Sequence, residues 1–343
     1  MKNFILLSKA GLSLRTKIKI YQRRALEIEA YLSRKPDEWH KFQKEFNTEV
    51  DNIFRDILEF EKSNNAEEQK GKVKKLKKFF IKRFRKIFMR GTYGPWSITK
   101  PLGYPGDYKI IDDIYRNVPS TSGFDRLFDN YFMMSTICKA VRNRKEDFKY
   151  LILDFIKNRR NQPVRIMDLA CGSCRDVKEM LESDTLICKN VIFDCYDREK
   201  RALEYAKGLL NGFTNVNLIQ KDILEMCTAK EIEFNIKERY DFIYSTGFFD
   251  YLGHRTCVKL IKNLKCILNK AGFLAISNVR DKYSNPSVHY MEWAGDWNLV
   301  YRDDGEFKRI FLKAGFHEDG LKTQFEQKKV LQYIIATKNE EES

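Results

Sequence analysis

From residue 163 onward, short apolar runs alternate with longer amphipathic segments. The apolar runs predict strands at 164–170, 191–197, 216–222, 240–246, 272–279 and 329–338. The segments between them repeat apolar residues every three or four positions, which predicts helices at 175–183, 198–211, 253–269 and 304–314. Apolar strands separated by helices are typical of a parallel sheet covered on both faces, so we expect an α/β fold with a doubly wound, mostly parallel sheet.

The first 160 residues have a helical pattern instead. Apolar spacing predicts helices near 15–33, 37–62 and 66–90, a short helix near 107–116, and a longer helical stretch at about 125–160. Gly, Pro and aromatic residues are dense at 91–124, which predicts an irregular connector. We therefore expect a basic helical region at 1–90, a connector or lid with helices at 91–160, and an α/β domain at 161–343.

Positive charge is concentrated near the start of the chain. The 343 residues carry a net charge of +15, and residues 1–100 alone hold 25 Lys and Arg against 12 Asp and Glu. No acidic residue occurs between Gln69 and Gly106. Two interpretations stay open for 70–90: a packed helix with a basic solvent face, or a weak contact with an anionic membrane or a nucleic acid.

Composition also bears on membrane insertion and on the redox state of the cysteines. No run of 18 apolar residues occurs, so we predict no transmembrane segment. The eight cysteines are scattered through a long chain, which fits a reducing cytoplasm better than a disulfide framework. Nothing in the pattern indicates an oligomeric state.

The stretch VRIMDLACGSCRDV, at 164–177, predicts a ligand loop between the first strand of the sheet and a helix. Its Asp168 ends the strand, and Gly172 lies in the turn where helix amides point at a ligand. A dinucleotide loop needs GxGxxG, but only Gly172 of the three matching positions is glycine, so NAD is disfavoured. S-adenosylmethionine has no phosphate and needs one tight turn with acidic groups around it.

Three acidic residues end consecutive strands: Asp168, Asp197 and Asp222. Asp197 can accept hydrogen bonds from ribose hydroxyls, and Asp222 from an adenine amino group. This pattern resembles class I S-adenosylmethionine-dependent methyltransferases over about 163–338, which implies a seven-stranded Rossmann-like sheet with a final antiparallel strand. Candidate cofactor-binding residues are Asp168, Ala170, Gly172, Asp197, Arg198, Asp222, Ile223, Ser245 and Tyr104.

The two cysteines of the loop have another interpretation. Cys171 and Cys174 form a CxxC pair, which occurs in redox and zinc sites. A four-cysteine zinc site needs a second pair with such spacing, and the sequence has none, so we predict no metal. Cys174 stands where many methyltransferases carry a further glycine, and we expect cofactor binding to survive that change.

Three stretches are more specific: PLGYPGDYKIIDDIY (101–115), YSTGFFDYL (244–252) and NPSVHYMEWAGDWNLVYR (285–302). Together they resemble the bacterial 3-hydroxy fatty acid methyl ester synthases over about 95–338. The resemblance implies methyl transfer to a small-molecule acceptor, either a fatty acid-like carboxylate or a hydroxyl. A pocket built from 93–108, 246–252 and 285–302 is expected.

Within these stretches we expect three catalytic candidates, Asp250, His289 and Arg302. Candidate substrate-binding residues are Tyr251, Tyr290, Glu292, Trp293 and Tyr301. Each catalytic candidate has a plainer alternative: a helix cap for Asp250, a structural hydrogen bond for His289, and a structural ion pair for Arg302.

Two other functions stay open. The basic region would suit an RNA methyltransferase, although Ser245-Thr246-Gly247-Phe248 lacks the Pro-Pro-aromatic element of base-directed enzymes. A non-catalytic interaction protein could also keep this fold, although the acidic strand ends argue against it.

Overall fold

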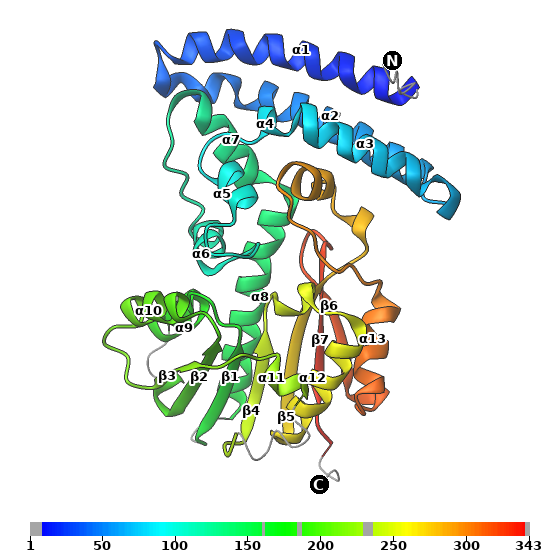
Figure 1. The fold of residues 1–343 in the computed structure, drawn as a ribbon. Helices are drawn as coiled ribbons and strands as arrows, with labels where there is room; N and C mark the ends of the chain where they lie inside the picture. Colours follow the sequence, from blue (N-terminus) through cyan, green and yellow to red (C-terminus); the bar gives the residue numbers. More distant parts are fainter. Residues whose placement is uncertain (1–8, 160–161, 184–186, 229–235, 340–343) are drawn as a thin grey trace. The chain divides into compact units, whose positions relative to one another are not determined.

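A computed structural model describes residues 9–159, 162–183, 187–228 and 236–339 (Figure 1). The chain forms two compact units. The helical unit contains residues 1–106, 117–139 and 285–298, and the sheet unit contains 107–116, 140–284 and 299–343. This grouping differs from the three consecutive regions expected above, because the chain enters each unit more than once.

The helical unit contains α1 (Lys9–Leu32), α2 (His40–Ser63), α3 (Lys70–Arg83), α4 (Arg85–Phe88), α5 (Tyr93–Thr99) and α7 (Gly123–Met134). The helix expected at 66–90 is broken at Phe84, which has φ −128° and ψ −20°. Phe80 and Phe88 on either side of the break both pack on Phe54 of α2. The break therefore lets two short helices bury aromatic side chains against one partner.

The buried carboxylate of Asp129 in α7 fixes the start of the connector. Its Oδ1 accepts hydrogen bonds from the backbone amides of Thr92 (2.7 Å) and Tyr93 (3.3 Å), and its Oδ2 accepts one from the Thr121 hydroxyl. The carboxylate thus accepts from amides at the start of α5, which have no partner within the helix. The Gly- and Pro-rich sequence did not indicate this helix.

The sheet unit contains a seven-stranded sheet in the order β3-β2-β1-β4-β5-β7-β6. The strands are β1 (Val164–Leu169), β2 (Val191–Asp197), β3 (Val216–Gln220), β4 (Tyr240–Ser245), β5 (Leu268–Val279), β6 (Leu321–Phe325) and β7 (Leu331–Thr337). The first five pair in parallel, and β7 is antiparallel to both β5 and β6. This confirms the predicted fold class, including its antiparallel final strand.

Most helices of the sheet unit lie close to their expected positions, but the short helix at Glu225–Thr228 was not predicted, and the helical stretch expected at about 125–160 is interrupted at Ser135. The helices of this unit are α6 (Tyr108–Arg116), α8 (Thr136–Asn158, entering from the helical unit), α9 (Arg175–Ser183), α10 (Lys200–Leu209), α11 (Glu225–Thr228), α12 (His254–Cys266) and α13 (Asp304–Lys313). The apolar pattern missed one strand, β6, because Leu321–Phe325 is an edge strand with exposed polar side chains and little apolar alternation.

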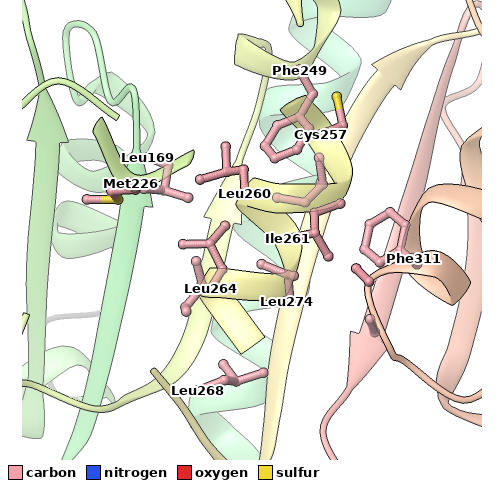
Figure 2. Close-up of a cluster of buried hydrophobic side chains, with 14 of the residues drawn as sticks. Leu169, Met226, Phe249, Cys257, Leu260, Ile261, Leu264, Leu268, Leu274 and Phe311 are labelled. Carbon is pink, nitrogen blue, oxygen red and sulfur yellow. The ribbon is translucent and has the colours of Figure 1, made fainter. Parts of the chain in front are cut away.

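Both faces of the sheet are covered. On one face α12 packs Leu260, Ile261 and Leu264 against β1, β4 and β5, and Phe311 of α13 completes this core (Figure 2). On the other face the rings of Phe148 and Phe155 in α8 lie 5.1–6.1 Å from aromatic rings of β4, β5 and β7. The edge where the parallel strands end is thereby held rigid from both sides.

No described helix is long and apolar enough to cross a membrane. All eight cysteines are free thiols.

Candidate active site

The turn between β1 and α9 has an unusual backbone. Ala170, Gly172 and Cys174 all lie in the left-handed region, with φ of 57°, 57° and 52°. A Cβ on Gly172 would meet Tyr108 at 3.6 Å, an ordinary contact, so glycine is needed there for its backbone conformation and not for space. A residue with a Cβ stores of order 1–3 kcal/mol of strain in this region, which the rest of the turn must hold in place.

The end of β2 provides that restraint. The Cys171 amide donates to the carbonyl of Tyr196 at 3.0 Å, and the Gly172 amide donates to Oδ2 of Asp197 at 2.9 Å. Asp197 Oδ1 accepts from the Glu199 amide at 2.8 Å, so each carboxylate oxygen holds one amide and keeps a free lone pair. Burial raises the pKa of Asp197, while these two amides lower it.

Asp168 lies at the end of β1 and is buried. Its pKa is held well above the usual range, first by burial and then by the nearby carboxyl of Asp176 and thiol of Cys171. The Tyr244 hydroxyl donates to Asp176 Oδ2 at 3.0 Å. The loop therefore surrounds a buried group of acidic side chains.

A polar hollow of about 610 Å³ opens where β2 and β3 end. It is lined by Arg198, Glu199, Gln220, Lys221, Asp222 and Glu225. Two predicted cofactor residues, Arg198 and Asp222, thus face one cavity. Asp222 Oδ1 accepts from the Leu224 amide at 2.9 Å, whereas Ile223 is buried in the core cluster of the sheet.

These residues fit S-adenosylmethionine. The hollow has space for an adenosine and offers carboxylates to its hydroxyl and amino groups, and the left-handed Gly172 turn adjoins Asp197. The Ser245 hydroxyl donates to the Leu169 carbonyl at 2.9 Å and ties β4 to β1, and its cofactor role stays a prediction. Tyr104 belongs to the helical unit, and its role stays a prediction.

A second polar group lies where β4 and β5 end. Arg144 of α8 is 4% exposed, and its Nη1 lies 3.4 Å from both Asp250 Oδ2 and Ser277 Oγ. Its Nε is buried without a hydrogen-bond partner. A Cβ on Gly247, just after β4, would lie 3.2 Å from Arg144 Nη2, so this glycine leaves room for the guanidinium.

Similarity to known proteins supports the cofactor interpretation. The family description "Methyltransferase domain" matches residues 161–335, more than half of the chain. The chain belongs to this methyltransferase family. A second methyltransferase description matches residues 60–222 and so includes α3. S-adenosylmethionine, predicted from the acidic strand ends, is the cofactor that family membership supports.

A solved structure shares the fold of this methyltransferase. A possible exported protein from Bordetella parapertussis aligns at 15% identity with a TM-score of 0.56, over 68% of this chain and 79% of its own. Magnesium protoporphyrin IX methyltransferase from Synechocystis PCC 6803 with bound SAH aligns more weakly, at 10% identity and a TM-score of 0.44, over 60% and 88%. No curated protein matches the sequence.

Both carboxylate oxygens of Asp250 in the methyltransferase have polar partners. Its Oδ1 accepts from the Val279 amide (2.7 Å) and from Asn278 Nδ2 (2.8 Å), and its Oδ2 faces Arg144. Burial raises its pKa, while Arg144 and these donors lower it. The carboxylate does not cap the helix near 253, the alternative considered above, because its side-chain partners are on β5 and α8.

Both terminal nitrogens of Arg302 donate to structural partners. Its Nη1 donates to the Phe249 carbonyl (3.1 Å) and to Asn278 Oδ1, and its Nη2 donates to the Leu252 carbonyl. Neither Glu292 nor Asp304, the ion-pair partners considered from the sequence, is among these acceptors. The contacts favour a structural role for Arg302, which joins the segment after β4 to the end of β5.

The other candidates divide between the units. In the helical unit, His289 is buried with Nε2 2.7 Å from Glu61 Oε2, and the rings of Tyr290 and Trp293 pack on Phe54 and Phe80. Glu292 is buried in the same π-helical turn, Tyr290–Ala294. In the sheet unit, Tyr251 is exposed, and Tyr301 has a buried hydroxyl. Their substrate roles stay predictions.

Arg144 was missed by sequence reasoning. It lies among charged residues of a long amphipathic helix, in the run RNRKED, where nothing marks one arginine as buried. A signal was available in the helical spacing: Arg144 precedes Phe148 by four residues, and both lie on the face of α8 that packs on the sheet.

Proposed function

We propose that this methyltransferase moves the methyl group of S-adenosylmethionine onto a carboxylate of a small-molecule acceptor. The supporting observation is Arg144, a buried cation with an unpartnered Nε at the carboxyl end of β4. Ligands of doubly wound sheets bind at this edge. The resemblance to 3-hydroxy fatty acid methyl ester synthases favours a fatty acid-like acceptor.

The geometry of Arg144 suits a carboxylate. Asp250 and Ser277 contact Nη1 at 3.4 Å, and the Tyr115 hydroxyl also hydrogen-bonds the guanidinium. The unpartnered Nε can donate to a carboxylate oxygen of the acceptor. Asp250 keeps the buried guanidinium charge balanced before the acceptor arrives, so it is a positioning residue in this proposal.

The sulfonium of the bound cofactor supplies an already activated methyl group. The chain has to align the acceptor oxygen and exclude water. A carboxylate is already a nucleophile, so no base is required. For a hydroxyl acceptor, Asp250 or His289 would have to be that base, and the hydrogen bonds of Asp250 to the Val279 amide and Asn278 oppose this role for Asp250.

The test is methyl transfer from labelled S-adenosylmethionine to fatty acids and to extracted metabolites, with products identified by mass spectrometry. Arg144→Gln should lower kcat/KM for a carboxylate acceptor by about ten- to a hundredfold, because a charged hydrogen bond contributes roughly 1.5–3 kcal/mol, and leave cofactor affinity unchanged. Arg159→Gln is the matched control, since Arg159 pairs with Asp241 at the opposite edge of the sheet. Equal losses in both variants, or transfer only to acceptors without a carboxylate, would refute the proposal.

Two further expectations remain proposals. The exposed lysines of α3, such as Lys75 and Lys78, could make weak contact with an anionic membrane or RNA. A cytoplasmic location is proposed from the free cysteines.

A further inference from the structure

A cluster of sulfur and oxygen atoms lies beneath the cofactor loop. One carboxylate oxygen of Asp168 and the Sγ atoms of Cys174 and Cys195 all lie within 4.8 Å of one another, and all three residues are buried. Cys195 is on β2, directly opposite Asp168 in the β1–β2 register. Three potential ligands therefore converge from a strand, a turn and the neighbouring strand. Cys171 lies in the same turn, three residues before Cys174, and is a fourth candidate ligand outside this 4.8 Å group.

The three residues of this cluster are acidic and buried. Burying ionisable acidic groups without a cation is unfavourable unless they stay protonated. A bound cation would remove that penalty, because it would hold the thiols and the carboxyl in their charged forms.

The separations suit a small thiophilic ion. Zinc binds thiolates at about 2.3 Å and carboxylate oxygens at about 2.0–2.2 Å in a tetrahedron, which places neighbouring ligand atoms roughly 3.5–3.8 Å apart. Atoms already within 4.8 Å need only small side-chain shifts to reach that arrangement. The spacing of Cys171 and Cys174 is that of a common zinc half-site.

We propose that Asp168, Cys174 and Cys195, completed by Cys171, bind one thiophilic divalent cation such as zinc. The sequence favoured no metal because it has no second CxxC pair, but here the remaining ligands come from a neighbouring strand and from the strand end. Binding releases the thiol protons to solvent and involves no change in oxidation state. Cys171, the only one of the three thiols that is not buried, provides the route of entry.

The position of the cluster implies coupling to the cofactor. Cys171 and Cys174 flank Gly172, whose amide is held by Asp197, so a cation would fix the turn that S-adenosylmethionine uses. Metal and cofactor affinities should then change each other by the same factor. This coupling rests on the proposed function, whereas metal binding by itself does not.

Cobalt(II) is the probe for the test, because thiolate coordination gives it a charge-transfer absorption and zinc should displace it. The full-length protein, reduced and free of cofactor, should bind one equivalent of cobalt with that absorption. Cys195→Ser and Cys174→Ser should each weaken binding at least about tenfold. Cys266→Ser and Cys138→Ser should bind normally, since these thiols lie outside the cluster.

The wild-type spectrum keeps the test valid if a variant fails to fold. Absence of thiolate charge transfer in the reduced wild-type protein would overturn the proposal, as would normal binding by both cluster variants. A cobalt site in a protein that does not bind S-adenosylmethionine would support the metal site, and would refute the proposed function together with the coupling that rests on it.

Discussion

Replacing Arg302 by Gln separates a structural role from a catalytic one. The substitution removes donors to the carbonyls of Phe249 and Leu252 and to Asn278 Oδ1, all in buried surroundings. A buried acceptor left without a partner costs about 1–3 kcal/mol, and breaking buried charged contacts typically costs 3–5 kcal/mol in total. For a unit of this size, such a loss should lower Tm by roughly 10 °C.

The assay is thermal unfolding, combined with calorimetric titration of S-adenosylmethionine. We expect Arg302→Gln to lower Tm and to weaken both cofactor binding and turnover, since the strand ends it joins would separate. Arg302→Lys keeps a charge but cannot reach the same set of acceptors, so it should recover little. An unchanged Tm with intact cofactor affinity and lost turnover would refute the structural role and return Arg302 to the acceptor site.

Three further predictions concern the cofactor, the pH response and the basic helix. Asp197→Ala should weaken S-adenosylmethionine binding at least about tenfold in calorimetry, because it removes a charged acceptor and frees the Gly172 amide; unchanged affinity would exclude Asp197 from the site. Burial raises the pKa of Asp250 above its unfolded value, so its contribution to stability is present below about pH 4 and is lost as pH rises through the folded pKa. From pH 4 to pH 8 the Tm of Asp250→Asn should therefore rise relative to the Tm of wild type. A relative fall in the variant's Tm over this range would contradict the raised pKa. Reversing the charges of Lys75 and Lys78 should abolish any salt-sensitive binding to anionic vesicles or RNA and leave turnover intact; lost turnover would instead indicate a role in the fold.

The sheet was largely predictable because its strands are buried on both faces. Val164–Leu169 and Val191–Asp197 are mainly apolar runs with an acidic residue, Asp168 or Asp197, at or next to the carboxyl end. The sequence alone therefore indicates both the strand and the end that faces the ligand. Edge strand β6 was not predictable in this way, since solvent covers one of its sides and polar residues are tolerated.

The candidate site was predictable only where it follows a strand. Asp197 and Asp222 were found because strand ends of a parallel sheet meet at one edge. Arg144 comes from a helix that precedes the sheet and lies next to Asp250, and Cys195 lies within a strand next to Cys174. Both neighbours are brought together by packing, which the local spacing of residues does not reveal. Trp293 and Tyr290 were expected in a substrate pocket because their segment mixes aromatic and polar residues. In the structure their rings pack in an aromatic core of the helical unit.

The chain passes repeatedly between its two units, and this limits how the gene can change. Residues 285–298 belong to the helical unit although they lie between β5 and α13, and Trp293 within them is 1% exposed beside Phe80. A gene that lost its first hundred codons would leave that segment without the aromatic partners that bury it. Recombination therefore cannot exchange the helical unit as a cassette, and we expect related genes to gain, lose and inherit both units together.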